Sequence, residues 1–164
     1  MNSVATPVYQ HDMELPSEAA TVSIARRLAA VARSGDVIAL NGDLGAGKTS
    51  FARGFIAALT GGAEEAPSPT FTLVQTYDSA QGTIWHFDLY RLARPDDVLE
   101  LGLEDALAEG ITLIEWPERI AGMLPKERLD LTLSFAPGND NARQLHLAGH
   151  GDWAPRLQSV VGHG

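Results

Sequence analysis

The sequence predicts an α/β fold, a three-layer sandwich in which helices cover both faces of a mixed sheet. Short apolar runs at 37–40 and 111–114 are typical of strands that are buried on both faces. The stretches 71–90 and 128–150 each alternate apolar and polar residues around a turn, which indicates two antiparallel hairpins. Segments with apolar residues at helical spacing lie between these strands. Buried strands combined with hairpins require a sheet of mixed direction.

The length and composition favour one globular domain. The 164 residues are expected to form a single unit over 1–164, with a loose leader at 1–10 and a C-terminal extension at 151–164. Hydrophobic residues make up 45% and charged residues 20%, without an apolar run of membrane-spanning length. The N-terminus lacks the basic and apolar regions of a signal peptide, so we expect a cytoplasmic protein without a membrane partner.

The net charge argues against direct binding of nucleic acid by this chain. The chain has 21 acidic and 12 basic residues, a net charge of −9, so a polyanion such as tRNA would be repelled. We expect no strong unaided nucleic-acid binding, and any tRNA to be held by a partner protein. Cysteine is absent, which excludes disulfides, thiolate catalysis and sulfur-ligated metals.

The first elements are an edge strand, a helix and a buried strand. Residues 11–15 could form the edge strand. Ser17 suits a helix N-cap, and the apolar residues at i, i+4 and i+7 from Ile24 share one face of the helix that follows. Gly35 is a plausible end for this helix, before the buried strand 37–40.

The next loop has the phosphate-binding pattern G-x-x-x-x-G-K-[ST] from Gly42 to Thr49, between the strand 37–40 and a predicted helix at 51–59. Its glycines permit a close backbone approach to phosphates, and the helix dipole adds to the attraction for anions. Lys48 would reach the β- and γ-phosphates, and the Thr49 hydroxyl would ligate Mg²⁺. The predicted nucleotide-binding residues are Gly45, Ala46, Gly47, Lys48, Thr49, Ser50 and, beyond the loop, Thr70. The fold is therefore predicted to be P-loop NTPase-like.

Two absent motifs favour ATP/ADP over GTP. The guanine-reading N-K-x-D cannot occur, because Lys48 follows Gly47 and Lys126 follows Pro125. The GTPase motif D-x-x-G occurs nowhere in the chain. We therefore expect ATP or ADP, together with Mg²⁺, as the bound nucleotide and metal.

A phosphate loop also needs a carboxylate from a neighbouring strand to hold Mg²⁺, and Asp88 and Glu115 are the two candidates. Glu115 follows the longer apolar run and lies at the carboxyl end of its strand, where ligands gather in open α/β sheets. We predict Thr49 and Glu115 as metal ligands, and Glu115, Asp88 and Lys48 as catalytic residues. Asp88 would act on the attacking water or tie the hairpin to the phosphate side. An exchange of roles between the two acids stays open.

A candidate switch precedes the first hairpin. It consists of Ser68, Pro69, Thr70 and Phe71, after a Gly-rich stretch. Thr70 lies on a proline-stiffened loop that could order around the γ-phosphate and relax after hydrolysis. The alternative for Thr70 is an ordinary strand cap.

Other positions have weaker signals. His86 is predicted to pack or to form a hydrogen bond, since no other histidine lies at metal-ligand spacing from it. Trp116, beside Glu115, belongs either to the core or to a functional surface that a partner contacts. A helix start is predicted at 95–97, and further short helices are predicted at 103–109 and 153–161.

Together these motifs resemble the TsaE (YjeE-type) P-loop ATPases of bacterial tRNA threonylcarbamoyladenosine biosynthesis. The matching segments are the phosphate loop at 42–49, S-P-T-F at 68–71, H-F-D-L-Y-R-L at 86–92 and I-E-W-P-E at 114–118. They follow one another in the family's order and cover residues 17–133. The last two segments are far more specific than the phosphate loop alone.

The resemblance implies an ATPase that binds and slowly hydrolyses ATP with Mg²⁺. It would support a partner complex, TsaB–TsaD, which transfers threonylcarbamoyl to an adenosine of tRNA, so that tRNA is reached only through partners. The resemblance puts Lys48 on phosphate and Thr49 with Glu115 on Mg²⁺. It makes Asp88 and Trp116 functionally required and the 68–71 segment switch-like. A free-standing small-molecule kinase and a nucleotide-binding adaptor that does not hydrolyse ATP stay open as alternatives.

Overall fold

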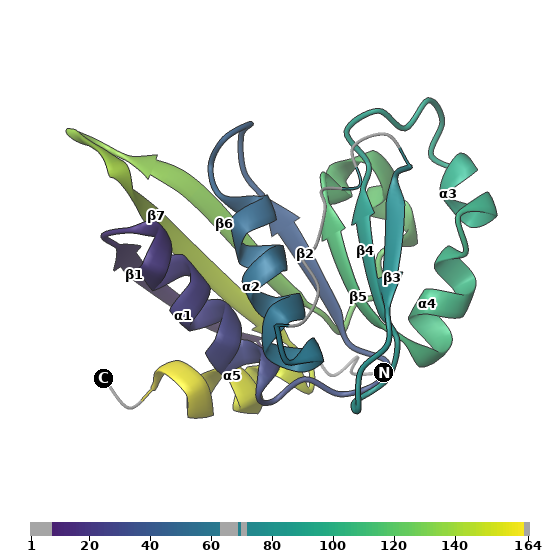
Figure 1. The fold of residues 1–164 in the computed structure, drawn as a ribbon, viewed down its shortest axis with the longest axis horizontal. Coiled ribbons are helices and arrows are strands. Elements are labelled where there is room, and N and C mark those ends of the chain that lie inside the picture. The colour runs from purple at the N-terminus through teal and green to yellow at the C-terminus, as the bar shows by residue number, and fades with distance from the viewer. Residues whose placement is uncertain (1–7, 63–68, 70–71, 163–164) are drawn as a thin grey trace, which may run out of the picture.

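The computed structural model describes residues 8–62, 69 and 72–162, and its strands form one seven-stranded mixed sheet (Figure 1). The strands are β1 (Val8–Leu15), β2 (Val37–Asn41), β3 (Val74–Tyr77), β4 (Ile84–Asp88), β5 (Ile111–Glu115), β6 (Leu129–Ala136) and β7 (Asn139–His150). They lie in the order β1-β7-β6-β2-β5-β4-β3. The central pairs are parallel, and the pairs β1–β7, β6–β7 and β3–β4 are antiparallel. The predicted mixed sheet and both predicted hairpins are confirmed.

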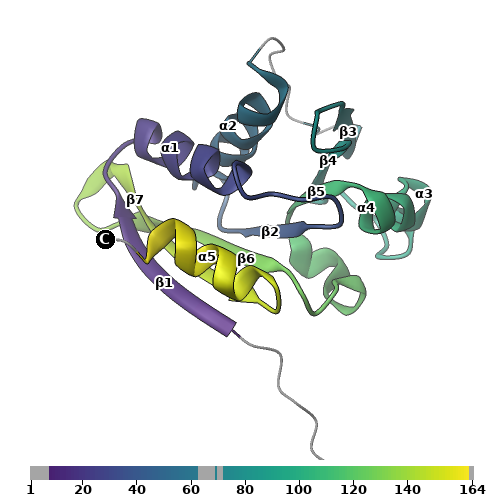
Figure 2. The ribbon, with the colours of Figure 1, turned by 90° about the horizontal axis from the view of Figure 1, so that it is seen from below.

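Helices cover both faces of this sheet. They are α1 (Glu18–Ala29), α2 (Lys48–Thr60), α3 (Asp97–Glu100), α4 (Leu103–Glu109), the 3-10 helix η1 (Pro117–Met123) and α5 (Trp153–Val161). One buried cluster joins α1, α2 and α5 to the sheet, and a second joins α3, α4 and η1 to the other face. Alternation along β2 explains the two clusters, because Ile38 and Leu40 enter the first and Val37 enters the second. Figure 2 shows α1 beside α2, and α5 alongside β1 at one end of the sheet.

None of the helices in the described part of the chain has both the length and the apolar character needed to cross a membrane.

The loose leader expected at 1–10 is too long, because β1 already begins at Val8. Val8 and Gln10 pair in register with His150 and Ala148 of β7, so backbone hydrogen bonding holds this segment as an edge strand. Tyr9, Met13 and Leu15 alternate with exposed residues along β1 and pack on the first buried cluster, so the half-buried face of this strand extends beyond the predicted 11–15. Residues 1–7 lie outside the described part of the chain.

The segment expected as a C-terminal extension contributes to the core through α5. Trp153 and Leu157 belong to the first buried cluster. Arg156 pairs with Asp36, which precedes β2, through two hydrogen bonds of 2.7 Å, and both side chains are about 8% exposed. The guanidinium of Arg156 also lies 4.0 Å from the centre of the Trp153 ring. This buried ion pair fastens the end of the chain to the start of the phosphate-loop strand.

Replacing Arg156 with alanine should lower the free energy of unfolding by about 3–5 kcal/mol, because the Asp36 carboxylate would be left buried without its charged partner. Urea unfolding followed by circular dichroism measures the loss. Arg33→Ala is the matched control, since Arg33 forms an exposed pair with Asp152 at 3.2 Å. Arg33→Ala should lower the free energy of unfolding by at most about 1 kcal/mol. Equal losses in the two variants would contradict a special role for the buried pair.

Candidate functional site

The phosphate loop joins β2 to α2, and at two positions its backbone has a positive φ that glycine adopts easily and other residues do not. Gly42 has a φ of +147°, and a Cβ there would lie 2.5 Å from the carbonyl oxygen of Leu133. Gly47 has a φ of +109° and is the N-cap of α2, which begins at Lys48. No described side chain caps α2, so the amides of its first turn remain available to an anion.

Lys48 is nearly buried, at 5% exposure. Its ammonium donates a hydrogen bond to the Gly42 carbonyl and lies 3.5 Å from the centre of the Trp116 ring. Burial lowers the pKa of Lys48, while the nearby carboxylates, Glu115 foremost, raise it in part. The lysine is thus held at the loop by a carbonyl and an aromatic face, two partners that a phosphate group can replace.

Trp116 has a backbone conformation unusual for a large side chain. Its φ of +60° and ψ of +50° lie in the left-handed region, which is unfavourable by roughly 1–2 kcal/mol for a residue with a Cβ. The ring lies over Lys48 and 4.9 Å from the ring of Tyr90. The turn is completed by Pro117, the first residue of η1. Strain of this kind is typical of functional sites, and it aims the ring at the loop lysine.

The two candidate acids lie side by side, because Asp88 of β4 pairs in register with Glu115 of β5. Glu115 is the acid that contacts the phosphate loop: Thr49 Oγ1 lies 3.1 Å from Glu115 Oε1 and 3.4 Å from Oε2. The Glu115 side chain is only 3% exposed. His86 Nε2 approaches Glu115 Oε2 to 2.7 Å from the same face of the sheet. Both partners of the carboxylate therefore come from other elements.

Asp88 accepts a hydrogen bond from the backbone amide of Tyr90 at 3.1 Å. Burial raises the pKa of Asp88; the Tyr90 amide opposes the shift and the charge of Glu115 adds to it. The Asp88 amide also donates to the carbonyl of Leu73, whose own amide donates to Pro69. Pro69, a residue of the predicted switch, is therefore tied to the neighbourhood of Asp88. Ser68, Thr70 and Phe71 lie outside the described residues.

Two hollows flank the phosphate loop. The larger, of about 350 Å³, is lined by Leu44, Gly45, Lys48, Thr49, Asp88, Tyr90, Arg91, Glu115 and Trp116. The smaller, of about 110 Å³, is lined by Glu18, Thr21, Gly45, Ala46, Gly47, Ser50, Asn141 and Arg143. The predicted lysine, hydroxyl, both acids and Trp116 thus meet in one hollow, while Ala46, Gly47 and Ser50 line the other.

Arg143 is a residue of this site that the sequence reasoning missed. Its guanidinium donates to the carbonyl oxygens of Ala46 at 3.1 Å and Gly45 at 3.2 Å, and it lies 4.6 Å from the centre of the Phe135 ring. It therefore braces the phosphate loop from β7. No local motif marks it, because the contact depends on where the second hairpin lies.

The oxygen ligands fit Mg²⁺. This ion prefers hard oxygen donors and is usually held by one or two carboxylates together with substrate phosphates and water. Thr49 and Glu115 offer a hydroxyl and a carboxylate in contact with each other. Within the described ranges, no group of three or more His, Cys, Asp and Glu side chains could hold a metal ion by itself. Thr49 and Glu115 are thus the two residues here that could contribute oxygen donors to such an ion.

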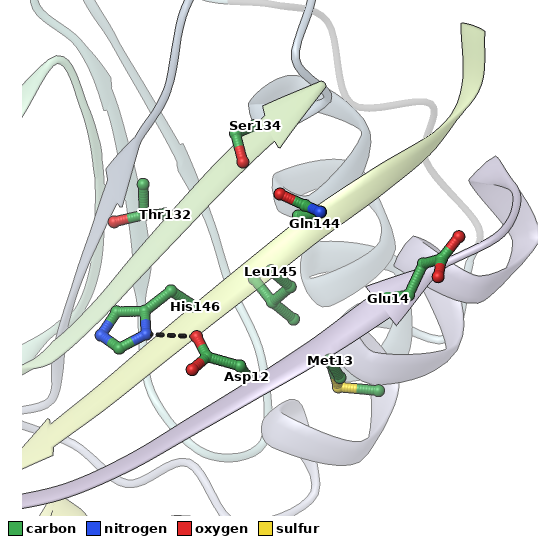
Figure 3. Close-up of a pocket in the computed structure, with 8 residues that line it drawn as sticks. All are labelled: Asp12, Met13, Glu14, Thr132, Ser134, Gln144, Leu145 and His146. Atoms are coloured by element: carbon green, nitrogen blue, oxygen red, sulfur yellow. Dashed lines mark hydrogen bonds and ion pairs between the residues drawn. The ribbon is translucent and has the colours of Figure 1, made fainter. Parts of the chain in front are cut away.

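A further hollow, of about 440 Å³, lies on the other face of the sheet, over β1, β7 and β6 (Figure 3). There His146 of β7 contacts Asp12 of β1 at 2.6 Å, and the two side chains are 42% and 82% exposed. Thr132 and Ser134 line the same hollow. An exposed pair of this kind contributes little energy, and no phosphate-loop residue reaches it. The chemistry of the site therefore belongs to the hollow beside the loop.

The chain is similar to known proteins in both sequence and fold. The family model described as "Threonylcarbamoyl adenosine biosynthesis protein TsaE" matches residues 15–145. The chain belongs to the TsaE family. That family includes a tRNA threonylcarbamoyladenosine biosynthesis protein TsaE of Rickettsia bellii, 45% identical over 121 residues, which are 74% of this chain and 84% of the relative. The TsaE of Bacillus subtilis is 38% identical over 133 residues, 80% of this chain and 81% of the relative.

The TsaE fold is equally evident in three dimensions. The crystal structure of YdiB from Bacillus subtilis superposes with a TM-score of 0.77 at 32% sequence identity. The superposition covers 96% of this chain and 97% of YdiB. The family and fold class predicted from the motifs are therefore confirmed.

The raised pKa of Asp88 has a measurable consequence for stability. The folded chain binds this proton more tightly than the unfolded chain, so ionised Asp88 destabilises the fold at neutral pH. Asp88→Asn keeps the acceptor for the Tyr90 amide and should raise the urea midpoint at pH 7. The gain should vanish below the ordinary aspartate pKa of about 3.9, where the wild-type carboxyl is also neutral.

Asp78→Asn, in the exposed turn between β3 and β4, is the matched control and should leave the midpoint nearly unchanged. A lower midpoint for Asp88→Asn than for wild type at pH 7 would contradict the expected sign.

Proposed function

We propose that this TsaE-family chain is an ATPase that binds and slowly hydrolyses ATP with Mg²⁺ in support of the TsaB–TsaD complex, during threonylcarbamoyl modification of a tRNA adenosine. The observation that carries the proposal is the contact between Thr49 and Glu115, 3.1 Å apart beside the buried Lys48. A loop hydroxyl and a strand-end carboxylate are the two protein groups that hold Mg²⁺ on a triphosphate in phosphate-loop enzymes. Family membership supports the biosynthetic role.

The two hollows suggest how ATP would lie across the loop. The β- and γ-phosphates would occupy the hollow of Lys48 and Thr49, where Lys48 would leave the Gly42 carbonyl and the Trp116 ring for phosphate oxygens. The nucleoside end would lie toward Ser50 and Arg143, on the other side of the loop. Uncapped amides of α2 would bind the phosphates between these ends. Thr49 and Glu115 would hold Mg²⁺, which neutralises charge that develops on the phosphates.

Asp88 is suited to orient the attacking water and to accept a proton from it. It lines the same hollow as Lys48, and it is paired in register with Glu115. Its raised pKa makes it a better proton acceptor than an ordinary aspartate near neutral pH. Glu115 has its oxygens engaged by Thr49 and His86, so Asp88 is the acid with more freedom to orient water.

Partner dependence is supported by the charge and by the family. A chain of net charge −9 is poorly suited to hold tRNA, so we propose that tRNA is reached through TsaB–TsaD, in the cytoplasm. A free-standing kinase would need a second binding place for its acceptor and usually a basic lid, for which 12 basic residues leave little room. An adaptor without hydrolysis would not need Asp88 beside the phosphate hollow.

The deciding experiment measures phosphate release from ATP by the purified chain, with and without TsaB–TsaD, and in parallel screens small metabolites for phosphorylation. We expect slow Mg²⁺-dependent release that the partner complex increases. Turnover with a small acceptor and none with the partners would establish the kinase alternative. Tight ATP binding without release under any condition would establish the adaptor.

Glu115→Ala should lower the rate of Mg²⁺-dependent hydrolysis by more than about 100-fold. The loss of an outer-shell partner of a metal typically costs roughly 10- to 100-fold, and Glu115 is a proposed direct ligand. The fold should survive, because Glu115 belongs to neither of the two apolar clusters. Glu104→Ala, at an exposed position of α4, is the control and should keep full activity. Near wild-type hydrolysis in Glu115→Ala, together with its loss in Asp88→Ala, would mean that the two acids exchange roles.

A further inference from the structure

His86 has a contact that its sequence context did not reveal. It lies at the centre of β4 and is fully buried, with backbone pairing to Gln75 of β3 on one side and Leu113 of β5 on the other. Its Nε2 is 2.7 Å from Glu115 Oε2, and this is the only hydrogen-bond contact of the ring in the part of the chain that the structure describes. Among the described residues, the ring therefore forms its one hydrogen bond with a single carboxylate oxygen.

The two oxygens of Glu115 have different surroundings. Oε2 lies close to His86, whereas Oε1 is the oxygen nearer to the Thr49 hydroxyl, at 3.1 Å against 3.4 Å. An Nε2–H that donates to Oε2 fixes the plane of the carboxylate and leaves Oε1 facing the phosphate loop. Without this donor the carboxylate could turn toward Lys48, whose pKa the charge of Glu115 raises in part, and would lose the orientation that a shared metal ion requires.

The sheet makes His86 a rigid support. Its backbone is held by strands on both sides, so the ring has little freedom to move without disturbing β4. Nδ1 is buried and has no partner among the described residues, which leaves a polar atom unsatisfied in the core. An unsatisfied buried polar atom is unfavourable, and packing in the core does not by itself require a polar ring at this place. Among the described residues, the contact of Nε2 with Glu115 is thus what the imidazole provides and an apolar side chain would not.

We propose that His86 is a positioning residue, which holds the Glu115 carboxylate toward Thr49 so that the pair can bind Mg²⁺ on the nucleotide. The inference rests on the proposed function, because it assigns a role in the same ATP site. It concerns orientation through one hydrogen bond, and His86 itself touches neither nucleotide nor metal.

The test compares His86→Phe with His86→Gln by calorimetric titration of ADP, with Mg²⁺ varied and with EDTA. Phenylalanine removes the donor, whereas glutamine can place an amide N–H near the position of Nε2. In His86→Phe, the Mg²⁺ concentration needed for half-maximal tightening of ADP binding should rise about 10- to 100-fold. ADP affinity in EDTA should stay within about twofold, because Lys48 and the loop amides are untouched. His86→Gln should stay close to wild type.

Two controls separate orientation from general damage to the sheet. Thr112→Val removes a buried hydroxyl of β5 that has no hydrogen-bond partner among the described residues, and it should leave the Mg²⁺ response unchanged. In a Glu115→Ala background, His86→Phe should produce no further change, because the carboxylate that it positions is gone. If His86→Phe fails to fold, His86→Asn takes its place, since its shorter amide cannot reach Oε2.

The outcomes are distinct. Equal loss of ADP affinity with and without Mg²⁺ in the His86 variants, or an additive effect in the Glu115→Ala background, would overturn the positioning role. A wild-type chain whose ADP binding does not respond to Mg²⁺ would instead overturn the proposed function. A Mg²⁺-selective loss in His86→Phe that His86→Gln restores would establish the role.

Discussion

The buried carboxylate of Glu115 is the group on which the site depends. An ionised carboxylate away from water is strongly unfavourable unless hydrogen bonds replace its hydration. Here the replacement comes from the Thr49 hydroxyl at the start of α2 and from His86 on β4, so three elements must be placed correctly at once. The strand order β2-β5-β4 brings them together, because β5 lies between the strand that leads into the phosphate loop and the strand that carries His86.

Several features of the site oppose the stability of the fold. Lys48 is buried with a lowered pKa, Asp88 is buried with a raised pKa, and Trp116 has a left-handed backbone. Two apolar clusters on opposite faces of the sheet, and the buried pair of Asp36 with Arg156, hold the surrounding structure against these effects. If the proposed triphosphate binds, its negative charge would oppose the lowering of the Lys48 pKa by burial. Under the proposed function, nucleotide binding would therefore stabilise the fold.

Local patterns predicted the fold class well, because strand alternation, helical periodicity and the glycine pattern are properties of neighbouring residues. They also selected both acids and the loop lysine. Prediction placed the edge strand at 11–15, although β1 begins at Val8, and it left His86 without an assigned partner. It missed Arg143 altogether, since an arginine on a hairpin strand has no local feature that marks it as a brace of the phosphate loop.

The sequence by itself determined the types of chemistry: a glycine-rich loop of the phosphate-binding pattern, strand-end carboxylates and a net charge of −9. These follow from short-range sterics, spacing and charge, which need no knowledge of the fold. Only the tertiary structure decided that Glu115, and not Asp88, faces Thr49, and that His86 supports it. The reason is physical: such contacts join residues far apart in the chain, and they depend on the order and register of strands. The phosphate loop is thus evident locally, but the partners that make it a site come from the sheet.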